Sequence, residues 1–74
     1  MPNEIHRRIK MARVGAGMSQ ADLASAMSDI LGSKVTRALI HNTENGSRSP
    51  RLTELEAIAN ATDQTVAWLI GGAI

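Results

Sequence analysis

The 74-residue chain has no cysteine, one aromatic residue and a net charge of +1, and these features exclude several classes of protein. Without cysteine it forms neither disulfides nor thiolate metal sites. With a single tryptophan it lacks the stacking platforms of a single-strand nucleic-acid binder. No apolar run reaches the ~20 residues of a membrane span. We therefore expect one small cytoplasmic domain over residues 1–74, with a thin core and no membrane, cofactor or metal.

The charges are divided unevenly along the chain. Residues 1–51 hold all eight basic side chains and four acidic ones, whereas residues 52–74 hold three acidic side chains and no basic one. The balance is therefore +4 in the first segment and −3 in the second. This favours an anionic partner for the first segment. The alternative is that the charges only solvate the surface.

Helix signals recur along the chain, whereas strand signals are absent, which predicts an all-α fold. A first helix is expected from Asn3, a good N-cap, to about Val14. Ile5, Ile9 and Ala12 follow helical spacing and should form its inner face.

A second helix should begin after Ser19, whose hydroxyl can cap it, with Asp22 favoured by the dipole in the first turn. Gly32 should end it. Its apolar face is expected to consist of Leu23, Met27, Ile30 and Leu31.

A third helix is expected to begin at Thr36, another capping residue, and to end at residues 45–46, where Gly46 can adopt the left-handed conformation. Ile40 and Thr43 share its inner face. Only about a third of its surface is apolar, so most of this short helix must face something polar.

A fourth helix should begin with Ser49 as cap and Pro50 as its first residue. Its core stripe is expected to be Leu52, Leu55, Ile58 and Ala59. A fifth helix should follow Thr65, end at residues 71–72, and bring in the apolar residues Val66, Trp68, Leu69 and Ile70. Five short helices joined by tight turns predict a compact five-helix bundle.

Three segments, "MSQADLASAM", "VTRALIHNTENGSRSP" and "VAWLIGG", resemble the Cro/repressor-type (XRE-like) helix-turn-helix regulators of phages and bacteria. The resemblance covers the chain from about Ile9 to Gly72. It implies a bundle of the phage repressor DNA-binding-domain type, in a bacterial cell or a phage-infected host. The helix-turn-helix would span about residues 19–46, and the third helix, about 36–45, would enter the DNA major groove.

The resemblance implies contact with DNA for Gln20, Arg37, Ala38, His41, Asn42 and Asn45, and the other candidates follow from their places on or beside the third helix. Arg37 suits the O6 and N7 atoms of guanine, and Asn42 suits adenine; for Arg37 a phosphate contact or plain solvation remains the alternative. Leu39 is expected to be exposed and to contact thymine methyls, or else to fill a gap against the second helix. The base-contact candidates are Arg37, Ala38, Leu39, His41 and Asn42. The phosphate-contact candidates, which set register without reading sequence, are Gln20, Lys34, Thr36, Asn45, Arg48 and Arg51.

By the same resemblance, Glu44 pairs with Arg13 of the first helix and so orients the third helix. The chain departs from the family pattern between Ser19 and Ile40, which are 21 positions apart. The surplus of about six residues lies near "SDILGSK" and predicts an extended second helix or a longer turn before the third.

Trp68 has two interpretations, a core anchor for the fifth helix or part of a dimer surface. The residues of that surface would be Val66, Trp68, Ile70 and Ile74. The leading hypothesis is a transcriptional regulator that binds double-stranded DNA in a sequence-specific manner. We expect a repressor rather than an activator, and we expect it to bind a two-fold operator as a homodimer. The alternative is an antitoxin-like or adaptor protein-interaction module. Enzyme activity is not expected, because no catalytic constellation is present, and neither is a small-molecule ligand.

Overall fold

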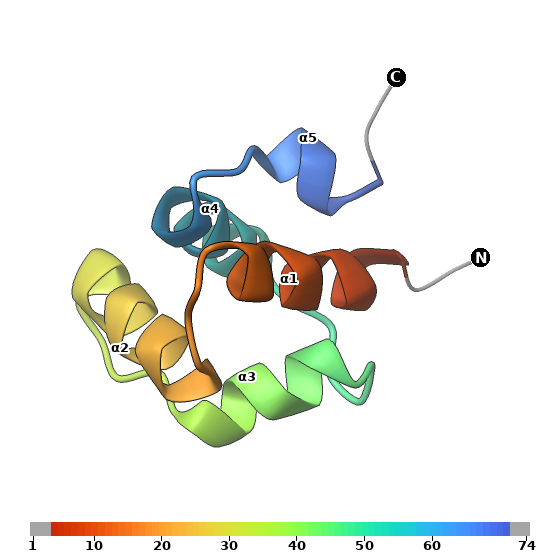
Figure 1. Cartoon of the computed structure of the whole chain (residues 1–74). Helices are drawn as coiled ribbons and strands as arrows, with labels where there is room; N and C mark the ends of the chain where they lie inside the picture. Colours follow the sequence, from red (N-terminus) through yellow and green to blue (C-terminus); the bar gives the residue numbers. More distant parts are fainter. Residues whose placement is uncertain (1–3, 72–74) are drawn as a thin grey trace.

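In a computed structural model, residues 4–71 are described, and they form five helices and no strand (Figure 1). This confirms the predicted all-α fold. The expected cap Asn3 and the expected terminator Gly72 lie outside the described residues. The helices are α1 (Glu4–Gly15), α2 (Gln20–Leu31), α3 (Arg37–Glu44), α4 (Leu52–Thr62) and α5 (Val66–Leu69).

Three helix starts are fixed by the side chains that the sequence predicted. The hydroxyl of Ser19 accepts from the N–H of Asp22, and the Asp22 carboxylate accepts from the N–H of Ser19, both at 3.0 Å. The hydroxyls of Thr36 and Thr65 each accept from the N–H three residues further along, at 3.2 and 3.0 Å. Each bond satisfies an N–H group that the helix itself leaves without a partner.

The start of α4 differs from the prediction. The helix begins at Leu52 with Arg51 as N-cap, and not at Ser49 and Pro50. The reason is Glu54, in the first turn, whose carboxylate accepts from the N–H of Arg51 at 3.0 Å. A carboxylate near a helix start satisfies backbone N–H groups as a cap does, so the helix begins two residues later.

The core lies between α1, α2, α4 and the inner side of α3. Each helix contributes at least one fully buried side chain, and these are Ile9, Leu23, Met27, Ile40, Ile58, Leu69 and Thr43. Two residues assigned to inner faces are instead exposed, Ile30 at 43% and Leu52 at 63%. Ile30 lies in the last turn of α2 and Leu52 is the first residue of α4, and side chains at helix ends have fewer neighbours to cover them.

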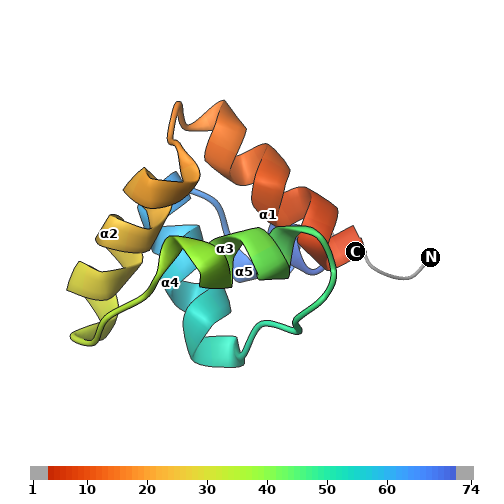
Figure 2. The same ribbon diagram turned by 90° about the horizontal axis from the view of Figure 1, so that it is seen from below.

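The arrangement leaves one side of α3 open. α1, α2 and α4 pack around the core, and α3 lies below α1 along the lower edge of the bundle (Figure 1). Seen from below, α3 crosses the front of the molecule, with α2 near its start and the α3–α4 loop, residues 45–51, at its end (Figure 2).

A connection of five residues, 32–36, joins α2 to α3. α2 continues to Leu31 and ends at Gly32, whose φ of 72° is the left-handed conformation expected there. Within residues 4–71, no helix is long and apolar enough to cross a membrane.

Candidate nucleic-acid interface

α3 has one face fixed in the protein and one face free. Ile40, Thr43 and Glu44 are buried against the bundle. The opposite face is exposed along the length of the helix and consists of Arg37, Ala38, His41 and Asn42. Leu39, expected to be exposed, is instead half-buried and packs against the core, because it lies where the two faces meet. An exposed polar face of this length suits contact with another polar molecule.

Glu44, at the end of α3, forms a buried ion pair with Arg13 of α1. The Nε of Arg13 donates to Oε2 of Glu44 at 2.6 Å, and its Nη2 donates to Oε1 at 3.1 Å. The two side chains are only 11% and 4% exposed. A third nitrogen of Arg13 donates to the carbonyl of Met18 at 2.8 Å. The guanidinium therefore links α1, the turn before α2 and α3.

Gln20, expected to contact a phosphate, also takes part in this network. Its Nε2 donates to Oε1 of Glu44 at 3.2 Å, which ties the start of α2 to the end of α3. The side chain is half-buried. A glutamine amide carries two hydrogens, so one donor remains for a further acceptor.

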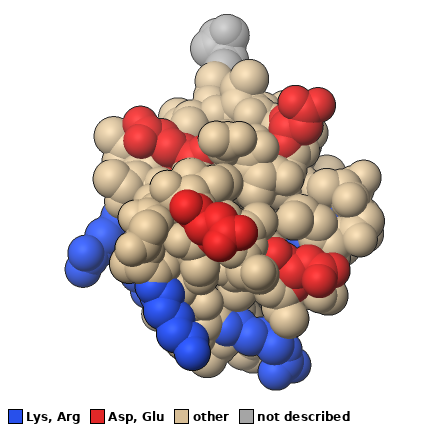
Figure 3. Space-filling view, turned by 90° about the vertical axis from the view of Figure 1, so that its left-hand side faces the viewer, with Lys and Arg blue, Asp and Glu red and all other residues tan. Residues whose placement is uncertain are grey.

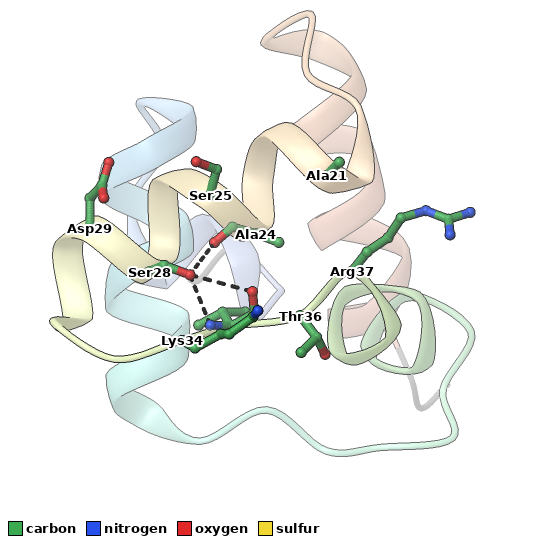
Figure 4. A pocket seen from close by; sticks show the side chains of 9 residues that line it. Ala21, Ala24, Ser25, Ser28, Asp29, Lys34, Thr36 and Arg37 are labelled. Atoms are coloured by element: carbon green, nitrogen blue, oxygen red, sulfur yellow. Dashed lines mark hydrogen bonds between the residues drawn. The ribbon is translucent and has the colours of Figure 1, made fainter.

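The start of α3 borders a groove against α2 (Figure 4). The groove is lined by the charged residues Asp29, Lys34 and Arg37 and by small residues of α2, namely Ala21, Ala24, Ser25 and Ser28. Ser28 bonds to the backbone on both sides of this groove. Its role was not predicted from the sequence, where a serine between apolar and polar helix faces gives only a weak signal.

In the α3–α4 loop, two cationic side chains expected near phosphates differ in their surroundings. Arg48 donates through both terminal nitrogens to the carboxylate of Glu54 at 2.7 Å, whereas Arg51 is exposed. The hydrogen bond from Arg48 lowers the pKa of Glu54, and the same bond raises the pKa of Arg48. Asn45 is also exposed and accepts from the N–H of Ser47 at 2.9 Å. The charge of Arg48 is therefore already balanced within the loop.

On the face of the molecule drawn in Figure 3, the positive charge lies toward α3. In Figure 3, the lysine and arginine side chains in view occupy the lower part of the surface, and the acidic ones lie mostly above them. Figures 1 and 3 share their vertical axis, and α3 is the lowest helix in Figure 1. Lys34, Arg37 and Arg51 are all exposed. Such a distribution attracts a polyanion to the α3 side of the molecule.

The described residues considered for a dimer surface differ in their exposure. Val66 and Trp68 are half-buried, whereas Ile70 is 52% exposed; Ile74 lies outside the described residues. The guanidinium of Arg8 stands 4.9 Å from the centre of the Trp68 ring and donates to the Trp68 carbonyl at 2.8 Å. Trp68 thus joins α1 to α5 within the molecule.

Among the described residues, no three histidine or acidic side chains come together as metal ligands do. No curated protein matches the chain significantly. A family model described as "helix-turn-helix domain" matches residues 4–67, which includes all of α1 to α4 and the start of α5. Domains of this family bind DNA through the second helix of the motif. Because this model matches most of the chain, the chain belongs to the helix-turn-helix domain family.

Proposed function

We propose that this chain is a sequence-specific transcriptional regulator that reads the major groove of double-stranded DNA with α3. The observation that supports this most is the division of α3 into two faces. Its inner face is fixed by the buried Arg13–Glu44 pair, while Arg37, Ala38, His41 and Asn42 are exposed. Base recognition needs donors and acceptors presented on a rigid element that fits the groove.

Each exposed side chain has a chemistry that suits a base edge. Arg37 would donate two hydrogen bonds to O6 and N7 of a guanine, and Asn42 would pair with N6 and N7 of an adenine. Ala38 is small enough for close approach and for contact with a thymine methyl. His41 would donate to a base or a phosphate. Leu39, at the border of the core, would reach a thymine methyl with its outer part only.

The phosphate contacts would lie on either side of α3. Lys34 and Thr36 precede the helix, and Asn45 and Arg51 follow it; Gln20, at the N-terminus of α2, would donate its remaining amide hydrogen to a phosphate. Arg48 would have to exchange Glu54 for a phosphate oxygen. Contacts of this kind fix the register of the protein on the duplex.

We propose further that two copies, each a single domain, bind a two-fold operator as a homodimer, with half-sites about 34 Å apart. One copy reads only a few base pairs, and a second copy supplies the remaining affinity. Repression is the simplest mode of regulation for such a dimer, because a protein that occupies the operator blocks the access of other proteins to this DNA. Ile70, a large apolar residue beside α5 that is 52% exposed, is the first position at which to look for contact between copies.

The decisive experiment is selection of bound duplexes from a random pool by the complete chain at moderate salt. We expect one enriched sequence with two-fold symmetry, bound at least about 10³-fold more tightly than random duplex. Recovery of no enriched sequence, with uniform weak binding, would contradict the proposal. A matched control is the variant Arg37→Ala, which we expect to enrich a less defined sequence.

A further inference from the structure

α3 is attached to the rest of the domain at both ends. At its C-terminal end, Glu44 pairs with Arg13 and accepts from Gln20. At its N-terminal end, the attachment runs through Ser28 of α2, which contacts the backbone of Val35, two residues before α3 begins. A short rigid helix held at two points has a fixed direction, and release of either point lets it pivot about the other.

The hydroxyl oxygen of Ser28 links two backbone segments of the chain, α2 at Ala24 and the α2–α3 connection at Val35 (Figure 4). Its Oγ lies 2.8 Å from the carbonyl oxygen of Ala24 and 2.8 Å from the nitrogen of Val35, and 3.3 Å from the carbonyl oxygen of Val35. A hydroxyl has one hydrogen and two lone pairs. The hydroxyl therefore donates to Ala24, the nearer carbonyl, and accepts from the N–H of Val35.

The N–H of Val35 depends on this oxygen. Val35 is only 8% exposed and belongs to the core, and a buried N–H group without a partner is costly. Between Gly32 and Val35, Ser33 and Lys34 are both exposed. The connection is thus anchored at its end rather than along its length, and the anchor lies just before the cap of α3, Thr36.

We infer that Ser28 is a positioning residue, which sets the direction of α3 and through it the sequence preference of the domain. The inference rests on the proposed function. Arg37, the first residue of α3, follows Val35 by two positions, so a shift of Val35 moves the guanidinium directly. Contacts to base edges require placement within about 0.5 Å. Phosphate contacts are electrostatic and depend less on the direction of the helix.

The test compares Ser28→Ala with Ser28→Thr in the complete chain. Ser28→Thr keeps the hydroxyl. The matched control is Ser25→Ala, an exposed serine of the same helix that lines the same groove. For each protein, affinity is measured for the duplex selected by the native chain and for a scrambled duplex of equal length, at several salt concentrations and well below the unfolding temperature.

We expect Ser28→Ala to lower the ratio of the two affinities by about tenfold, the equivalent of one misplaced base contact. The salt dependence of binding should stay unchanged, because no phosphate contact is lost. Ser28→Thr and Ser25→Ala should keep the native ratio. A merely structural role would leave the ratio of the folded protein unaltered.

An unchanged ratio in folded Ser28→Ala would overturn the inference. If that variant does not fold, Ser28→Cys, whose sulfur is a weak acceptor, takes its place, and a native ratio in Ser28→Cys overturns the inference equally. Failure of the native chain to prefer any sequence would instead contradict the proposed function. The two failures are therefore distinct.

Discussion

Arg48 of the α3–α4 loop forms two parallel hydrogen bonds to Glu54 in the first turn of α4. Each terminal nitrogen of the arginine lies 2.7 Å from one of the two carboxylate oxygens. The same carboxylate accepts from the N–H of Arg51. One side chain of α4 thus orders both the loop and the helix start. Glu54 is therefore the residue through which pH should act on this part of the fold.

Replacing Glu54 with glutamine should reduce the free energy of unfolding by about 1 kcal/mol at neutral pH, the upper range for a solvent-accessible ion pair. The hydrogen bond from Arg48 holds the pKa of Glu54 in the folded protein below the usual value of a glutamate. The stabilisation is therefore complete above that value and is lost as the pH falls through the lowered pKa. Thermal unfolding between about pH 7 and pH 3 should show the two proteins converging in acid. A difference that persists or grows in acid would contradict this role. Asp22, whose pKa is also lowered, chiefly by the backbone N–H of Ser19, titrates in both proteins and cancels.

Replacing Arg13 with alanine should destabilise the domain far more. The carboxylate of Glu44 would remain buried with only the Gln20 amide as a side-chain donor, at a cost of about 3–5 kcal/mol. Urea unfolding measures this loss. The double variant Arg13→Met with Glu44→Leu should recover most of it, because it leaves no buried charge. A single-variant loss below about 1 kcal/mol would mean that water reaches the carboxylate.

Arg37 and Lys34 should differ in what they contribute to DNA binding, although both are exposed and close in sequence. Arg37→Ala should reduce affinity for the selected duplex by about 1–3 kcal/mol and change scrambled duplex much less. Lys34→Ala should weaken both duplexes alike and lower the slope of log affinity against log salt by about one. Fluorescence anisotropy titrations over a salt series distinguish the two. Equal weakening of both duplexes by Arg37→Ala would assign that residue to a phosphate.

Gly46 is needed for its backbone conformation rather than for space. Its φ is +85°, and an added Cβ would approach the His6 ring no closer than 3.7 Å, an ordinary contact. Gly46→Ala should therefore cost about 1 kcal/mol of strain. Gly15→Ala is the matched control, since it ends α1 with nothing within 4 Å of an added Cβ. Calorimetry should show a lower melting temperature for the first variant and an equal or higher one for the second.

The parts of the fold that depend on neighbouring residues were predictable from sequence. Ser19, Thr36 and Thr65 cap helices by accepting from N–H groups three residues further along. Because both partners are close in sequence, these caps can be predicted from the local sequence alone. Gly32 likewise ends α2. Ser49 and Pro50 offered an equally good local signal, but the bonds to Glu54 moved the helix start to Leu52.

The parts that depend on residues distant in sequence were less predictable. Ile30 shares the apolar spacing of α2 and is nevertheless 43% exposed, because spacing does not reveal which turn of a helix its neighbours cover. Gln20 reaches Glu44 across 24 positions, and Ser28 reaches Val35 across the α2–α3 connection. Both bonds are set by the angle between α2 and α3, which no local pattern specifies.

The shortness of α3 has a consequence for how the domain should respond to its ligand. Eight residues are too few to form a stable helix in water, so the outward face of α3 exists only while its inner face is packed on the rest of the domain. Folding and the capacity to bind are therefore one cooperative event. A bound duplex stabilises the native state by mass action, and amides throughout the helices, including those far from DNA, should exchange their hydrogens more slowly in the complex.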